Sequence, residues 1–272
     1  MCIRDRMKNR DGRLLQTVCL PESGSKYARF LYRTTGGMLK GGAPNIFSIL
    51  PNSDTRTFYA ASCTGYSVCK FYKASEHYVG NHKGGIDAPV MRYAEALLIR
   101  AEAGAELGKD PELDKTINQL RARVGFTFKL EADPIADPDL IAKYPNVKGD
   151  NANLIREIRR ERRIELIAEG FRLDDLKRWN GMTALENPKT MFGVRVTDAV
   201  REQYKPGNIT FGGEDGRPVI EYQGKTYLYQ YPSKSLNDAG RKWSADDKRW
   251  LSPLPTDELT LNPNLEQNPG WK

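Results

Sequence analysis

The chain has 272 residues, 39% of them hydrophobic, which is enough to bury the core of one large domain or two small ones. Its formal net charge is +7, yet the 42 basic and 35 acidic residues are interleaved without a block of five like charges, which disfavours a nucleic-acid-binding role. It contains no run of eighteen apolar residues and no apolar stretch behind its charged start, so the sequence predicts neither a transmembrane helix nor a signal peptide.

Residues 1–84 are expected to form an irregular, partly stranded segment. Its first six residues, MCIRDR, resemble nothing that follows, so we expect that they are not native and that the sequence is truncated at its N-terminus. LLQTVCL and TFYAAS have strand composition, KFYKASEHYV carries an aromatic residue every few positions, and Gly-rich breaks separate them. The candidate ligand-binding residues are tyrosines that could stack on sugar rings, with packing of loops onto helices as the alternative: Tyr59, Tyr66, Tyr72 and Tyr78.

The chain offers few metal ligands. Its four cysteines form no C-x-x-C pair and only two histidines occur, so a zinc site is not expected. Cys63 and Cys69 flank TGYSV and could form a disulfide across a hairpin, or stay as two free thiols. The acidic pairs at 214–215 and 246–247 are too generic to predict calcium. We therefore expect no cofactor, and a structural calcium ion stays open.

Residues 85–180 are predicted to be a helical core. Asp87 can cap the first helix, Pro89 suits its first turn, and Gly108 ends it. Its apolar residues recur at helical spacing on one face, which is expected to be buried: Val90, Ala94, Leu97, Leu98, Ala101 and Ala105.

A second helix follows, with an apolar stripe of Leu113, Ile117, Leu120 and Val124, and Gly125 as its stop. Two antiparallel helices with small residues at their contact, Gly104 among them, are typical of a tetratricopeptide unit. One such pair cannot bury its own face, so further helices must complete the core.

A polar loop is predicted at 126–150, and then a third helix, NLIREIRRERRIELIAEG, capped by Asn151 or Asn153. At 100° per residue, Glu161 and Glu165 lie in line with the apolar stripe. The opposite face carries Arg156, Arg159, Arg160 and Arg163, a set that could grip phosphates, although no aromatic residues alternate with it. A short last helix, FRLDDLKRW, has an apolar stripe of Leu173, Leu176 and Trp179.

The aligned carboxylates Glu161 and Glu165 allow two readings. They could act as general acid and base, as in glycoside hydrolysis, or they could form a buried ion network with nearby arginines. Bidentate guanidinium partners would keep them ionised, which suits a clamp between helices, so we predict no catalytic residue. The predicted structural network comprises Arg92, Glu95, Glu161, Glu165, Arg172, Asp175, Arg178, Trp179 and Trp271.

Residues 181–272 are expected to be irregular, with short strands such as KTYLYQY. The chain closes on LSPLPTDELTLNPNLEQNPGW, which combines helix breakers with large apolar residues at fixed places.

Three segments together resemble the C-terminal part of the SusD/RagB family. They are RYAEALLIRAEA (92–103), IRRERRIELIAEGFRLDDLKRW (158–179) and the closing LSPLPTDELTLNPNLEQNPGW. The family forms are R-x-A-E-x-L-L-x-x-A-E-A, then E-R-x-x-E-L-x-x-E-G-x-R-x-x-D-L-x-R-W, and a final P-I-P-x-x-E-x-x-x-N-P-x-L-x-Q-N-P-G-W, where Leu254 replaces the isoleucine. Order, spacing and terminal position match, and the resemblance runs loosely across most of the chain.

The resemblance implies a mainly α fold of tetratricopeptide-like helical pairs with long irregular loops and a few short strands. It implies a surface-exposed outer-membrane lipoprotein that binds glycans, or in some cases peptides, and passes them to a SusC-type TonB-dependent transporter without catalysis. The lipid anchor and about half of a family member are expected upstream of these residues. No family ligand residue transfers to a matched position. The alternatives are a tetratricopeptide scaffold that binds a protein partner and a glycoside hydrolase that uses Glu161 and Glu165.

The resemblance also implies that the tail is an ordered strap across the helical body. Its prolines would hold it extended at little entropic cost. Each buried anchor would contribute about 1.5–3 kcal/mol, and the anchors are expected to be Leu254, Leu259, Leu261, Leu265 and Trp271.

Overall fold

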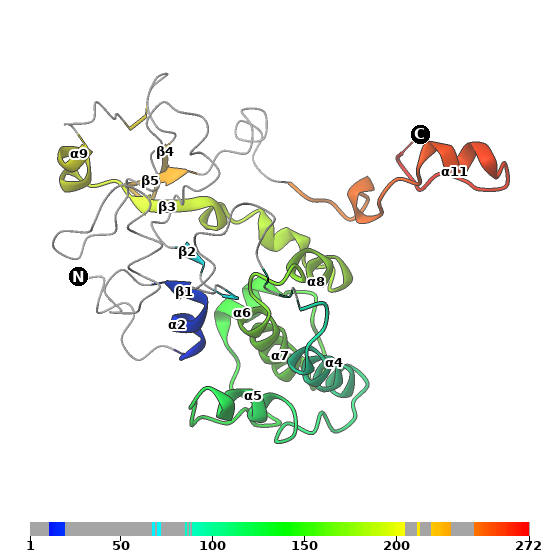
Figure 1. Cartoon of the computed structure of the whole chain (residues 1–272), viewed down its shortest axis with the longest axis horizontal. Coiled ribbons are helices and arrows are strands. Elements are labelled where there is room, and N and C mark those ends of the chain that lie inside the picture. Colours follow the sequence, from blue (N-terminus) through cyan, green and yellow to red (C-terminus); the bar gives the residue numbers. More distant parts are fainter. Residues whose placement is uncertain are drawn as a thin grey trace. The chain divides into compact units, whose positions relative to one another are not determined.

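A computed structural model describes residues 11–19, 67–68, 70–71, 85, 87, 89–204, 211–212, 219–229 and 242–271. The four candidate tyrosines and the Cys63–Cys69 pair lie outside these residues. The chain divides into two compact units, one formed by residues 1–172 and 191–231 and the other by residues 173–190 and 232–272 (Figure 1). Each unit is described by itself.

The first unit is built on helices, which confirms the predicted mainly α class. Its longest helices, α4 and α7, lie side by side, and α5 and α6 pack against this pair (Figure 1). Leu98, Ala101, Ile117 and Ile158 are fully buried in this helical core. The helices are α4 (Tyr93–Glu106), α5 (Ile117–Arg123), α6 (Pro138–Lys143) and α7 (Ala152–Glu165).

Helix α4 begins later than predicted. Asp87 and Pro89 precede it, and Val90 is 88% exposed instead of lying on the buried stripe. Arg92 is the N-cap residue and has an extended backbone, with φ of −144° and ψ of 154°. Its guanidinium is bound by carboxylates near the end of α7, so tertiary ion pairs, and not a capping side chain, accompany the start of the helix.

The contact between α4 and the turn before α5 depends on a small residue, as the sequence indicated. A Cβ atom at Gly104 would lie 2.8 Å from Pro111 Cα and 3.0 Å from Asp110 O, so only glycine fits here without a shift. The Thr116 hydroxyl donates to the carbonyls of Pro111 and Glu112 and so delays the start of α5 to Ile117.

The predicted loop at 126–150 contains a helix that the sequence analysis missed. Asp137 caps α6 by accepting hydrogen bonds from the backbone N–H groups of Asp139 and Leu140, and Pro138 occupies its first turn. Leu140 and Tyr144 are buried. The Asp137-Pro138 step within the predicted loop is therefore the beginning of a helix.

Strands occupy a small part of the first unit. LLQTVCL was predicted to be a strand, but its first four residues, LLQT, lie in helix α2 (Arg13–Thr17). Within the described part of this segment, only β1 (Val18–Cys19) is a strand, and it pairs antiparallel with β2 (Ser67–Val68). The other sheet has the antiparallel order β3-β5-β4 around buried Val196, Phe211 and Leu228. Its elements, with the helix that follows β3, are β3 (Phe192–Arg195), α9 (Asp198–Tyr204), β4 (Val219–Tyr222) and β5 (Lys225–Tyr229), the last within the predicted KTYLYQY strand.

The second unit contains the tail, which is not extended throughout. Helix α11 (Thr256–Leu261) follows Pro255, and Asp257 and Glu258 favour its first turn. Leu261 is 80% exposed and Leu265 is exposed as well, so these two predicted anchors are not buried within their unit. The remaining helical segments of the unit and its boundary are α8 (Arg172–Arg178), η4 (Met182–Leu185), η5 (Pro188–Met191) and η7 (Lys248–Trp250).

The end of the tail folds back on the segment around residues 248–254. The Trp271 Nε1–H donates to the carbonyls of Lys248 (2.9 Å) and Leu251 (2.8 Å), and the Lys248 Nζ lies 4.3 Å from the ring centroid. The Gln267 side chain bonds both backbone groups of Leu254, at 2.7 and 3.0 Å. The placement of this unit against the helical body stays a prediction.

Replacing Trp271 by alanine is expected to loosen residues 248–271, because the change removes two hydrogen bonds and a cation–π contact. The ring is partly exposed, so the loss should stay below the roughly 3–5 kcal/mol that a fully buried aromatic residue costs. Faster hydrogen exchange at Leu254 and a lower melting temperature are expected. Trp271→Phe keeps an aromatic ring, so its melting temperature should lie between those of the parent chain and Trp271→Ala. Unchanged exchange in Trp271→Ala would count against the tail contact.

Candidate functional site

Three glutamates align along the C-terminal end of α7. Glu161, Glu165 and Glu169 are spaced by four residues, which places successive side chains on one helical face, although Glu169 follows the last helical residue. Glu161 is 1% exposed and Glu165 is 4% exposed. Carboxylates at a helix C-terminus oppose the helix dipole, and buried charges require partners, so this position demands cations from elsewhere in the fold.

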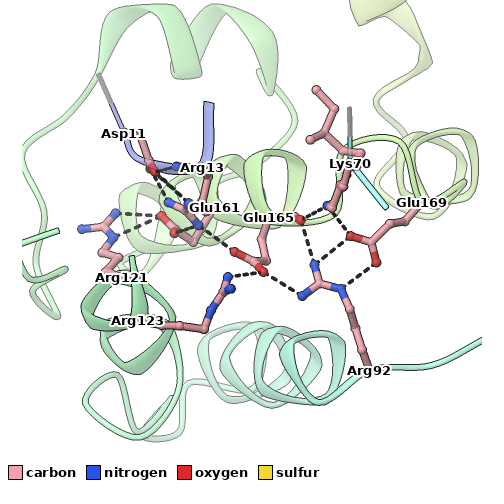
Figure 2. Close-up of polar contacts among 10 residues, drawn as sticks. Asp11, Arg13, Lys70, Arg92, Arg121, Arg123, Glu161, Glu165 and Glu169 are labelled. Atoms are coloured by element: carbon pink, nitrogen blue, oxygen red, sulfur yellow. Dashed lines mark hydrogen bonds and ion pairs between the residues drawn. The ribbon is translucent and has the colours of Figure 1, made fainter. Parts of the chain in front are cut away.

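Glu161 is held between two arginines. The Arg13 Nη1 lies 2.6 Å from its Oε1, and Arg121 approaches its Oε2 with Nε at 3.1 Å and Nη2 at 3.0 Å (Figure 2). Asp11 binds the other edge of Arg13, with 3.0 Å between Arg13 Nε and Asp11 Oδ1. Helix α2 and helix α5 are thereby fastened to α7 from two directions.

Glu165 lies at the centre of the cluster. Its Oε1 accepts from Arg92 Nη1 (2.7 Å) and Arg123 Nη2 (2.8 Å), and its Oε2 accepts from Arg13 Nη1 (3.1 Å). Figure 2 shows the three guanidiniums converging on this carboxylate from α2, the start of α4 and α5. One buried residue of α7 therefore contacts three other elements.

Glu169 binds Arg92 and Lys70. Arg92 donates to both carboxylate oxygens, from Nε at 2.6 Å and Nη2 at 2.8 Å, which is the bidentate geometry that guanidiniums favour. The Lys70 Nζ lies 2.5 Å from Glu169 Oε1. Arg92 and Lys70 also donate to the Glu165 carbonyl, and Lys70 to that of Ile167, so two tertiary cations satisfy carbonyls that the end of α7 leaves open.

Glu165 and Glu169 favour the ionised state. Burial by itself would raise the pKa of Glu165, but hydrogen bonds from Arg92 and Arg13 and the charge of Arg123 lower the pKa below its ordinary value. Burial likewise opposes ionisation of Glu169, and Arg92 and Lys70 lower its pKa. A general acid needs a raised pKa and access to substrate, so this arrangement is a clamp between elements and is unsuited to acid catalysis.

The structure brings together only part of the predicted network. Arg92, Glu161 and Glu165 meet in the cluster, whereas Glu95 makes no ion pair with the described residues. Arg172 donates to the Tyr144 hydroxyl at 3.3 Å instead of binding the glutamates. Arg172 is near the glutamates in sequence, but the arginines that reach them come from other segments.

The other predicted members lie in the second unit and form separate local contacts. Asp175 and Arg178 form an ion pair one turn apart at 2.8 Å, and the Arg178 guanidinium lies 4.7 Å from the Trp179 ring centroid. Trp271 binds the 248–251 segment, as described above.

Six residues of the cluster were missed. Arg121 and Arg123 lie on the predicted second helix, and Glu169 continues the four-residue spacing, so all three were visible as a pattern. Lys70 and the pair Asp11 and Arg13 come from segments that the sequence analysis left irregular, and no local signal places them at α7.

Two of the four arginines on the face of α7 opposite its apolar stripe are held by contacts within the first unit. Arg156 is 9% exposed and donates to the Val147 carbonyl at 2.5 Å, and Arg159 is 6% exposed and binds Glu106 at 3.0 Å. These two arginines fasten the preceding loop and α4 to the helix. Among the described ranges there is no group of three or more His, Cys, Asp or Glu side chains that could hold a metal ion. The helices in those ranges are also too short or too polar to cross a membrane.

A family model described as the SusD family matches residues 1–271 of the chain. A SusD-like protein of Formosa agariphila is 34% identical over 99 residues, covering 36% of this chain and 18% of that protein. The crystal structure of a SusD-like carbohydrate-binding protein from Bacteroides fragilis aligns with a TM-score of 0.55 and 23% identity, over 95% of this chain and 42% of the other. Another SusD-like structure from Bacteroides fragilis gives a TM-score of 0.46 and 25% identity, covering 78% of this chain and 32% of the other. The chain thus spans less than half the length of each of these proteins.

Proposed function

The chain belongs to the SusD family, and on this premise we propose that it is part of a non-catalytic protein that binds glycans for nutrient uptake. The family match over residues 1–271 is the observation that carries the proposal. It is supported by the similarity of the fold to that of the Bacteroides fragilis structure with a TM-score of 0.55. The tyrosines at positions 59, 66, 72 and 78 remain the proposed sugar-stacking residues.

The chemistry of the glutamate cluster supports binding without hydrolysis. Glu161 and Glu165, the pair that a glycoside hydrolase would need, are buried and engaged by arginines. The lowered pKa of Glu165 leaves it ionised at neutral pH, where a general acid must carry a proton. Family membership and the ionised state of Glu165 therefore both support binding without hydrolysis.

The proposal extends to a partner and a location. A SusC-type TonB-dependent transporter would accept the captured glycan, and the protein would stand on the outer-membrane surface, held there by a lipid anchor. Co-purification with a TonB-dependent barrel from the native membrane tests the proposed partner and location. A preparation without such a barrel would refute them.

The binding role is tested with a panel of neutral and acidic oligosaccharides, applied to the chain on an array and then in calorimetry. Reversible binding of at least one glycan, with the sugar recovered intact, is the expected result. Tyr72→Ala should weaken that binding, and Tyr204→Ala, a tyrosine from α9, serves as the matched control. Cleavage of the glycan that Glu161→Gln abolishes would replace the proposal with a hydrolase, and binding to no glycan would refute it.

A further inference from the structure

A cavity of about 210 Å³ lies beside the glutamate cluster, and its described lining belongs wholly to the first unit. Four cationic side chains line it, Arg13, Lys70, Arg92 and Arg123, and Glu165 is the one carboxylate in the described part of the lining. Drug-sized ligands occupy roughly 300–1,000 Å³, so this cavity suits a single sugar unit or a comparably small molecule.

The charges of the cluster do not cancel. Five cations, Arg13, Lys70, Arg92, Arg121 and Arg123, face four carboxylates, Asp11, Glu161, Glu165 and Glu169, which leaves one positive charge in excess (Figure 2). A ligand with a single negative charge would balance the site. A phosphate, which carries about −1.5 to −2 at neutral pH, would overshoot it.

Two donors at the cavity are available to a ligand. Arg123 donates from Nη2 to Glu165, its side chain is 51% exposed, and its remaining N–H groups bond no described residue. Thr17 is 5% exposed as a whole residue and lines the same cavity, where its hydroxyl can donate a hydrogen bond.

The cavity also has an apolar side. Phe71 and Ile164 line it, and the Phe71 ring is 45% exposed at a turn where the backbone has a positive φ of 64°. The Lys70 Nζ lies 5.6 Å from the Phe71 ring centroid. An aromatic ring beside a cation suits a ligand that joins a negative charge to a ring with C–H faces.

We propose that this cavity binds a carboxylate-bearing sugar, such as a uronate unit of an acidic glycan. Arg123 supplies the charge-assisted hydrogen bond to the carboxylate, Thr17 donates from its hydroxyl, and Phe71 packs against the sugar ring. The inference rests on the proposed glycan-binding function and names the ligand class for this part of the surface.

Calorimetric titration of the chain with galacturonate, methyl galactoside and acetate tests the assignment. Galacturonate should bind at least about tenfold more tightly than either of the others, because only it offers both the charge and the ring. Arg123→Gln should weaken galacturonate binding about tenfold or more, the loss expected for one hydrogen bond to a charged group. Arg100→Gln, at an exposed arginine outside the lining, should leave the binding unchanged.

Thr17→Val provides the second variant, because it keeps the side-chain shape and every ion pair of the cluster and removes only the hydroxyl. Thr17→Val should also weaken galacturonate binding, while its melting temperature stays close to that of the parent chain. Equal affinity for galacturonate and methyl galactoside, or for galacturonate and acetate, would overturn the inference. So would unchanged binding in both variants. If the inference fails in this way but neutral oligosaccharides still bind, the proposed ligand class is wrong and the proposed glycan-binding function stands. If galacturonate binds as expected but no oligosaccharide binds, the ligand class is right and the glycan-binding function is wrong.

Discussion

Glu165→Gln is expected to lower the free energy of unfolding by about 3–5 kcal/mol, the usual effect of removing one partner from a buried ion pair. The carboxylate is 4% exposed and binds Arg13, Arg92 and Arg123 at 2.7–3.1 Å. A glutamine of the same shape leaves three guanidiniums around a neutral amide, whose NH₂ group can only repel them. Urea denaturation of the two proteins, followed by circular dichroism, measures the difference.

Asp114→Asn is the matched control for this substitution. Asp114 also binds a cation, Lys129 at 2.9 Å, but both side chains are exposed, and exposed pairs contribute little. A denaturation midpoint close to that of the parent chain is therefore expected. The double variant Glu165→Gln/Arg123→Gln should recover part of the loss, because it removes one of the uncompensated charges. If Glu165→Gln were no more damaging than Asp114→Asn, the clamp would not hold the elements together.

The part of the site that the sequence predicted is the part set by helical periodicity. The apolar stripe of the third helix continues through Glu161 and Glu165, so their burial follows from a spacing of 3.6 residues per turn. Their need for arginine partners follows from the cost of burying charge. The identity of the arginine partners does not follow from the sequence, because Arg13 is 152 residues from Glu165 and Arg92 is 73 residues away.

Predictions based on closeness in sequence were wrong where tertiary contacts determine the partner of a side chain. Arg172 and Arg178 are closer in sequence to the glutamates than the true partners, yet they bind Tyr144 and Asp175. Similarly, LLQT has strand composition but lies in a short helix, whose Arg13 guanidinium is held by buried carboxylates. Such contacts outweigh intrinsic propensity, which amounts to under about 1 kcal/mol per residue.

Acidification is expected to unfold the chain through the same carboxylates. In the folded state the pKa values of Glu165 and Glu169 lie below the ordinary value of 4.5, because cation contacts outweigh burial. In the unfolded chain both carboxylates titrate near 4.5, so they take up protons there first. Their contribution to stability is therefore complete above pH 4.5 and is lost as the pH falls through the lower, folded pKa values. Each proton adds at most about 1.4 kcal/mol per pH unit to the slope.

Glu157 supplies the control for this pH dependence, because burial raises its pKa and so reverses the sign of its contribution. Its ionised form costs folding free energy at neutral pH, and this cost disappears on acidification. Urea midpoints measured from about pH 6 to about pH 3 should fall steeply below pH 4.5 for the parent chain and for Glu157→Gln, but less steeply for Glu169→Gln. Parallel curves for all three proteins would mean that other carboxylates govern acid unfolding. A shallower curve confined to Glu169→Gln would tie the acid sensitivity of the fold to the cations that close the end of α7.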